Sequence, residues 1–115
     1  MEDKLIELLS TFGYDVIRQG SLSEDDDYPD TFFTFWNNDE NGESAYDNVT
    51  TSVRYDFDVN CYSNDPAKAY DLLKQARTLL KNNGFVTPSR GHDVASDEDT
   101  HAGRGMNVLI LNNES

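Results

Sequence analysis

The stretch VTTSVRYDFDVNC, Val49–Cys61, alternates apolar and polar side chains along its length. A period of two predicts a β-strand with one buried face and one face toward water. Such a run exceeds the usual strand, so we expect a bend, or a first part that projects from the body as a hairpin arm. The apolar face carries Val49, Thr51, Val53, Tyr55, Phe57, Val59 and Cys61, and the polar face carries Thr50, Ser52, Arg54, Asp56, Asp58 and Asn60.

A helix follows this strand. Asp65-Pro66 combines a favourable N-cap with proline at the first helical position, and Asn83-Gly84 is a typical helix end. The helix would be a rod of roughly 27 Å, long enough to lie across a small sheet. We expect it to bury Leu73 and Leu80 against Phe57 and Val59. Its apolar stripe comprises Ala69, Leu72, Leu73, Ala76, Leu79 and Leu80.

The remaining segments complete a helix-and-sheet pattern. Apolar spacing predicts a first helix over Met1–Phe12, ended by Gly13, and further strands over Tyr14–Gln19, Thr31–Trp36, Phe85–Thr87 and Met106–Leu111. Aromatic residues on both faces of Thr31–Trp36 predict cover on one side and partial cover on the other. Polar loops are expected over Gly20–Asp30, Asn37–Asn48 and residues 89–103. The prediction is one α+β domain, residues 1–115, with an antiparallel sheet of about four strands and two helices packed on one face.

The charge balance is strongly acidic. The chain has 22 Asp and Glu against nine Lys and Arg, a formal net charge of −13 and a pI near 4.2. Direct binding to nucleic-acid phosphates or to anionic membranes needs clustered cations, so neither is expected. Two interpretations stay open. In the first, the acidic residues keep the protein soluble until a specific interface forms. In the second, they bind a basic partner protein by imitating a nucleic acid.

The single cysteine and the N-terminal segment indicate the state of the thiol and the location of the protein. Cys61 falls on the apolar strand face, where a buried, inert thiol is expected, and one cysteine makes no internal disulfide. Met1–Phe12 is amphipathic and acidic, unlike a secretory signal. No apolar run approaches the length of a membrane span. These features predict a cytosolic protein.

Candidate metal and catalytic sites are weak. Asn37–Asn48 imitates a calcium loop, but position twelve is Asn48 where a bidentate Glu is needed, so an acidic hairpin loop is the better interpretation. Asp25–Asp27 is interpreted as a solvated loop. His92 and His101 share a polar loop that offers little rigid support for a metal. No nucleophile elbow or phosphate loop is present. We therefore predict no catalytic residue, metal or cofactor, and no enzyme.

One family resemblance rests on the order of elements. The alternating strand Val53–Ser63 runs into the turn Asn64-Asp65-Pro66 and a helix to Leu80, followed by Asn83-Gly84-Phe85, an acidic loop and a closing strand Asn107–Leu111. This pattern, over most of the chain after Thr31, resembles the tail-terminator (tail-completion) proteins of long-tailed bacteriophages and prophages. The dense acid runs at 24–27 and 39–43 depart from that family.

The resemblance implies a ring subunit, six to a ring, at the head-proximal end of the tail tube. Such a ring stops tube polymerisation and presents a surface to the head. The implied partners are other copies of the chain, the tail tube protein and the head-tail connector protein, and the implied location is the host cytoplasm during assembly and then the virion tail. An acidic lumen would repel passing DNA. The interface residues we predict are Asp39, Glu40, Glu43, Arg54, Asp56 and Asp58.

Two other functions compete with tail termination. Another head-tail joining (neck) protein would have a similar size and composition, and the sequence does not distinguish a neck protein from a tail terminator. An acidic DNA-mimic inhibitor would bind a basic nucleic-acid-binding protein through Asp25–Asp27 together with Asp39, Glu40, Glu43, Asp56 and Asp58. A mimic needs acids at regular spacing on a rigid face, whereas the densest acid runs here fall in predicted loops.

Overall fold

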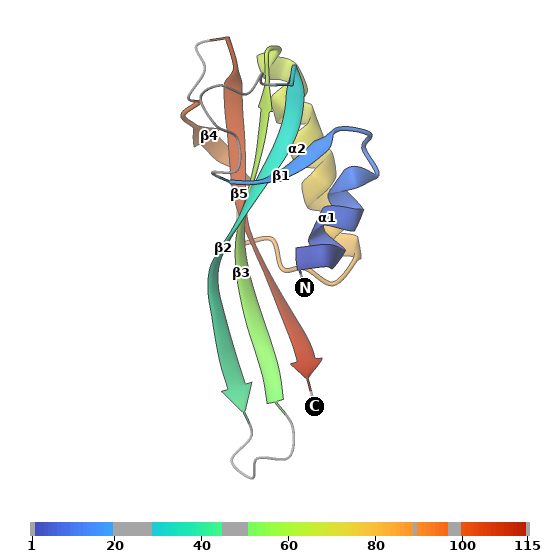
Figure 1. The fold of residues 1–115 in the computed structure, drawn as a ribbon, viewed down its shortest axis with the longest axis vertical. Helices are drawn as coiled ribbons and strands as arrows, with labels where there is room; N and C mark the ends of the chain where they lie inside the picture. The colour runs from blue at the N-terminus through green and yellow to red at the C-terminus, as the bar shows by residue number, and fades with distance from the viewer. Residues whose placement is uncertain (1, 20–28, 45–50, 89, 97–99, 115) are drawn as a thin grey trace.

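The chain folds into two helices and a mixed sheet. The computed structural model describes residues 2–19, 29–44, 51–88, 90–96 and 100–114 (Figure 1). Within them lie helices α1 (Glu2–Ser10) and α2 (Pro66–Asn82), and strands β1 (Asp15–Arg18), β2 (Thr31–Ser44), β3 (Thr51–Ser63), β4 (His92–Val94) and β5 (Ala102–Glu114). The sheet order is β1-β2-β3-β5-β4. The α+β class is confirmed.

The sheet differs from the prediction in strand count and in one pairing. The described residues form five strands rather than about four, and β1 runs parallel to β2, with Asp15 opposite Phe32. The additional strand is β4, which lies inside the predicted 89–103 loop and pairs His92 with Gly105. Phe85–Thr87, predicted as a strand, contributes only one bridge between Val86 and Leu109. Pro88 follows at once, and its missing N–H prevents a longer ladder there.

Strand β2 is longer than its sequence predicted. The predicted end at Trp36 is wrong, since β2 continues to Ser44 through residues expected to form a loop. These polar residues are poor strand formers, but β3 already offers them a backbone ladder, and this tertiary context overrides propensity. The register shifts between Asn37 and Asp39, which marks a β-bulge. Residues 45–48, the rest of that predicted loop, lie outside the described residues.

Three strands extend beyond the helices as an arm. We define the arm as residues 39–44 of β2, 51–56 of β3 and 109–114 of β5, which pair side by side. The body is the remainder, with α1 and α2 lying on one face of the sheet (Figure 1). The molecule is accordingly elongated, 53 × 29 × 22 Å. The expected projecting hairpin is present, and β5 adds a third strand to it.

The hydrophobic core lies between the helices and the covered face of the sheet. Leu73, Leu80, Phe57 and Val59 are all buried, as predicted. Hydrogen bonds at both ends of α2 hold the helix in place over these residues. The Asp65 carboxylate accepts a hydrogen bond from the Ala67 N–H at 3.1 Å, and after the helix ends the Phe85 N–H donates to the Leu80 carbonyl at 3.0 Å. The core also includes Leu5, Leu9, Phe33, Phe35, Cys61, Ala69, Leu72, Ala76, Phe85, Met106 and Val108, and it extends to Tyr55 and Ile110 at the base of the arm.

The opposite face of the sheet is partly covered, which confirms the expectation for Thr31–Trp36. Phe32 is buried and stacks on Tyr62 with ring centroids 5.4 Å apart, while Trp36 is 43% exposed. Asn60, expected on the wet face, is instead buried. A Cβ on Gly105 would collide with the Asn60 side-chain oxygen, so β5 approaches β3 closely only because this position is glycine.

Candidate functional site

A carboxylate cluster sits where the arm meets the body. Asp56 and Asp58 are neighbours on the polar face of β3, and the Asn107 side-chain amide lies between them. That amide donates to Asp56, to the Asp58 carboxylate at 3.3 Å and to the Phe57 carbonyl at 3.2 Å. Asn38 approaches the same Asp56 oxygen at 3.4 Å. The Asn107 amide of β5 therefore joins the two acids, and Asn38 of β2 adds a second donor to Asp56; the sequence did not predict either amide.

The remaining predicted interface residues lie along the arm. The register brings Asp39 directly opposite Asp56, so the two acidic segments meet across the β2–β3 pair. Glu40 pairs with Tyr55, and residues directly opposite in a sheet share a face, so Glu40 belongs to the face opposite Asp56. The full set of relevant pairs is Asp39 with Asp56, Glu40 with Tyr55, Asn41 with Arg54 and Glu43 with Ser52.

The two histidines play separate roles. The His101 Nε2 lies 2.8 Å from the Pro29 carbonyl oxygen, so this nitrogen carries the proton and donates. Its Nδ1 lies 2.9 Å from the Thr100 hydroxyl. His92 opens β4 and is exposed. Among the described residues, no group of three or more His, Cys, Asp or Glu side chains is arranged to hold a metal ion. Asp25–Asp27 lie outside those residues.

Cys61 is fully buried, as predicted. Burial raises the pKa of its thiol to about 12, because the thiolate would lose its hydration, and the positive charge of Lys68 only partly opposes this. The thiol therefore stays protonated at neutral pH, and a protonated thiol is a poor nucleophile.

A cationic cleft opens beside α2, and no sequence prediction anticipated it. We use this name for a cavity of about 420 Å³ whose walls include the aromatic ring of Tyr70 and the side chain of Leu73. Its charged lining comes from three separate parts of the chain: Lys74, Arg77 and Lys81 of α2, Arg90 in the connection to β4, and Arg104 of β5. This is a concentrated positive site on an acidic protein.

Two guanidinium groups of the cationic cleft are held in place. Arg104 lies over the Tyr70 ring, 5.1 Å from its centroid, and forms an ion pair with Asp93 at 3.1 Å. The Arg104 side chain is 21% exposed, whereas that of Asp93 is 95% exposed, so Asp93 lies at the rim. Arg77 donates to the Thr87 carbonyl at 3.3 Å. An exposed pair such as Arg104–Asp93 contributes little to stability, so an incoming anion can replace Asp93 at small cost.

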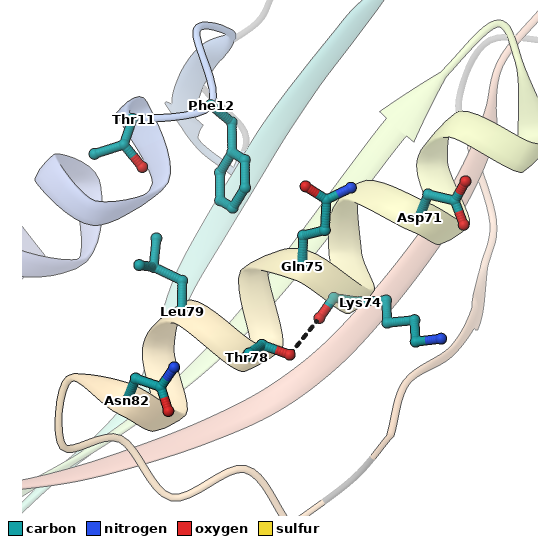
Figure 2. A pocket seen from close by; sticks show the side chains of 8 residues that line it. All are labelled: Thr11, Phe12, Asp71, Lys74, Gln75, Thr78, Leu79 and Asn82. Carbon is teal, nitrogen blue, oxygen red and sulfur yellow. Dashed lines mark hydrogen bonds between the residues drawn. The ribbon is translucent and has the colours of Figure 1, made fainter.

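A second hollow, of about 650 Å³, lies on the other flank of α2. Figure 2 shows Phe12, after the end of α1, and Leu79 of α2 pointing into the gap between the two helices. Polar side chains surround this apolar centre, and the Thr78 hydroxyl donates to the Lys74 carbonyl at 3.3 Å (Figure 2). The lining residues are Thr11, Phe12, Asp71, Lys74, Gln75, Thr78, Leu79 and Asn82. They include no paired nucleophile and base.

Comparison with known proteins found no match: no family model and no curated protein matches the chain. Within the described residues, neither helix has the length and apolar character needed to cross a membrane. The arm, the carboxylate cluster at its base and the cationic cleft are thus the features from which a function must be argued.

Proposed function

We propose that this chain is a non-catalytic assembly subunit of a phage or prophage tail, which caps the tail tube as a ring and joins it to the head. The observation that carries the proposal is the three-stranded arm projecting from a helix-covered body (Figure 1). The edges of such an arm present unpaired backbone groups, which are a ready template for pairing with another chain.

The edges of the arm favour assembly. In the described part of the chain, β1 pairs with β2 only from Phe32 to Phe35, and β4 pairs with β5 only from Gly103 to Gly105. Beyond the bridge between Val86 and Leu109, no other described strand covers the outer edges of β2 and β5 along the arm. Contacts between unlike surfaces of successive copies close into a ring when the rotation allows it, and otherwise grow into filaments. The ring of six subunits follows from the family resemblance alone.

The acidic surface suits the same role. With a net charge of −13, free copies repel one another and stay soluble until a specific contact forms. A ring whose inner surface is acidic would also let DNA pass without binding it. The proposed partners are other copies of the chain, the tail tube protein and the head-tail connector protein, first in the host cytoplasm and then in the virion tail.

The test is deletion of the gene from its phage or prophage, followed by electron microscopy of the particles. We expect tubes of uncontrolled length with no head attached. Tails of normal length beside unjoined heads would replace termination with a neck function. Fully normal particles would overturn the assembly role and leave the DNA-mimic inhibitor as the next candidate. Complementation with the intact gene is the control.

A further inference from the structure

The positive charge of this protein is gathered in one place. The whole chain has nine Lys and Arg, and five of them line the cationic cleft. Helix α2 supplies three of the five and contains a single acidic residue, Asp71, which lines the hollow on the other flank instead. In a chain with 22 acidic residues, this segregation leaves one face of the body positive.

The chemistry of the cationic cleft selects an anion. None of its described lining residues is acidic, and Asp93 at the rim forms an ion pair with Arg104. Guanidinium groups bind carboxylates and phosphates with paired, charge-assisted hydrogen bonds. The restraint of Arg104 by Tyr70 and of Arg77 by Thr87 reduces the entropy lost on binding. The volume of about 420 Å³ accommodates a few side chains rather than a folded domain.

The chain itself carries a segment of matching charge. Asp39, Glu40 and Glu43 lie on β2 in the arm, next to Asp56 of β3. This acidic arm cannot reach the cationic cleft of its own molecule, since the arm extends away from α2 and β4 along the long axis (Figure 1). A second copy can present the same segment without that restriction.

We propose that the cationic cleft is the docking site for the acidic arm of a neighbouring copy. Asp39 and Glu43 share one face of β2, and their carboxylates replace Asp93 and meet Lys74, Lys81 and the guanidinium groups. The contact joins unlike surfaces, so it repeats head to tail, as ring formation requires. This inference rests on the proposed assembly function and deepens it by naming the two surfaces that meet.

The test uses charge reversal in the full-length chain at low ionic strength, where such contacts are least screened. The cleft variant is Lys74→Glu/Lys81→Glu, chosen because both side chains are exposed. The arm variant is Asp39→Lys/Glu43→Lys, because these two residues share one face of β2. A third protein combines all four changes. Lys68→Glu, on the same helix but outside the lining of the cationic cleft, is the matched control.

Sedimentation equilibrium should show that the wild type self-associates and that each double reversal weakens association by at least about tenfold, equal to about 1.4 kcal/mol. The combined protein should return to within about threefold of wild type, because the opposite charges again face each other. Lys68→Glu should change little. The arm variant is decisive: general charge repulsion predicts stronger association for a less acidic protein, whereas docking predicts weaker association.

Three outcomes would overturn the docking proposal. A wild type that stays monomeric at about 1 mM removes the contact, since even a weak specific interface is populated there. An arm variant that associates as well as or better than wild type would show that the arm does not bind in the cationic cleft. Binding of inorganic tripolyphosphate in the cationic cleft, with association insensitive to the arm variant, would make the cleft a small-anion site. None of these results changes the gene-deletion phenotype, which tests the assembly function separately.

Discussion

Strand β3 runs through both the body and the arm, and its two halves differ although the sequence alternates in the same way throughout. In the body, Phe57, Val59 and Cys61 are fully buried under the helices. On the other face of the strand, Asn60 in the body is buried, whereas Arg54 in the arm is exposed and Asp56 is bound by amides from neighbouring strands. Alternation therefore specifies which side chains share a face, while the elements packed on that face decide whether it is a core or a surface.

The body and the arm also differ in charge. The flank of α2 gathers cations around the cationic cleft, while β2 carries Asp39, Glu40 and Glu43 into the arm. A net charge of −13 describes neither region. A total charge gives the sign of long-range repulsion, but docking depends on where the few opposite charges lie.

The largest difference between body and arm should appear in packing. Leu80→Ala removes a fully buried side chain on the inner face of α2 and should lower the free energy of unfolding by about 2–5 kcal/mol. Leu111→Ala is the matched change in the arm, where the side chain is 58% exposed, and should cost less than about 0.5 kcal/mol. Urea denaturation measures both. Equal losses would show that the arm belongs to the cooperative core.

A smaller effect is expected at the base of the arm. Asn107→Asp replaces the amide donor between Asp56 and Asp58 with a third carboxylate, and should destabilise the fold by about 1–3 kcal/mol at neutral pH. Asn38→Asp, which loses one longer and exposed contact, should cost clearly less. Thermal and urea unfolding of the two variants give the ranking. The reverse order would mean that Asn107 does not hold the acids together.

Alkaline pH should weaken the body through Cys61. The folded pKa of about 12 lies above the ordinary value of 9.0, so above pH 9 the unfolded chain loses the thiol proton first and stability falls with pH. Between pH 9 and about pH 10 this contributes a loss of about 1 kcal/mol. Cys61→Ala should lack that component, which appears as a shallower pH profile against wild type. Parallel profiles would show that the thiol is hydrated in the folded protein.

Salt should act in opposite directions on folding and on association. Raising NaCl from very low to moderate concentration screens the excess acids, because the Debye length falls to about 10 Å at 0.1 M, and the Tm should rise by a few degrees. The same screening should weaken docking of the acidic arm in the cationic cleft. Differential scanning fluorimetry and sedimentation at matched salt concentrations follow both. A flat Tm would indicate that the acids are locally paired.

The sequence predicted the parts of the fold that depend on local pattern. The α2 helix was visible in Asp65-Pro66, its apolar stripe and Asn83-Gly84, and the burial of Phe57 and Leu80 followed from periodicity. The extension of β2 to Ser44 was not predictable from residues such as Asn, Asp and Gly, because pairing with β3 supplies the stabilisation.

The cationic cleft was beyond sequence reasoning for a related reason. Lys74, Arg77 and Lys81 recur at spacings of three and four, which places them along one side of a helix, and this part was readable. Arg90 and Arg104 join them only when β5 packs against α2 and the 90–91 segment follows beside it. The predicted interface acids were named on charge alone, without the amides of Asn38 and Asn107 that organise Asp56.

The most direct test of the account is one comparison of the Asp39→Lys/Glu43→Lys arm variant with wild type, in which Tm and molar mass are measured on the same samples. If the arm serves assembly and the body carries the stability, the variant keeps the wild-type Tm or exceeds it, while its mass falls to that of the monomer. A variant that melts as early as Leu80→Ala, or that assembles more strongly than wild type, would contradict the account.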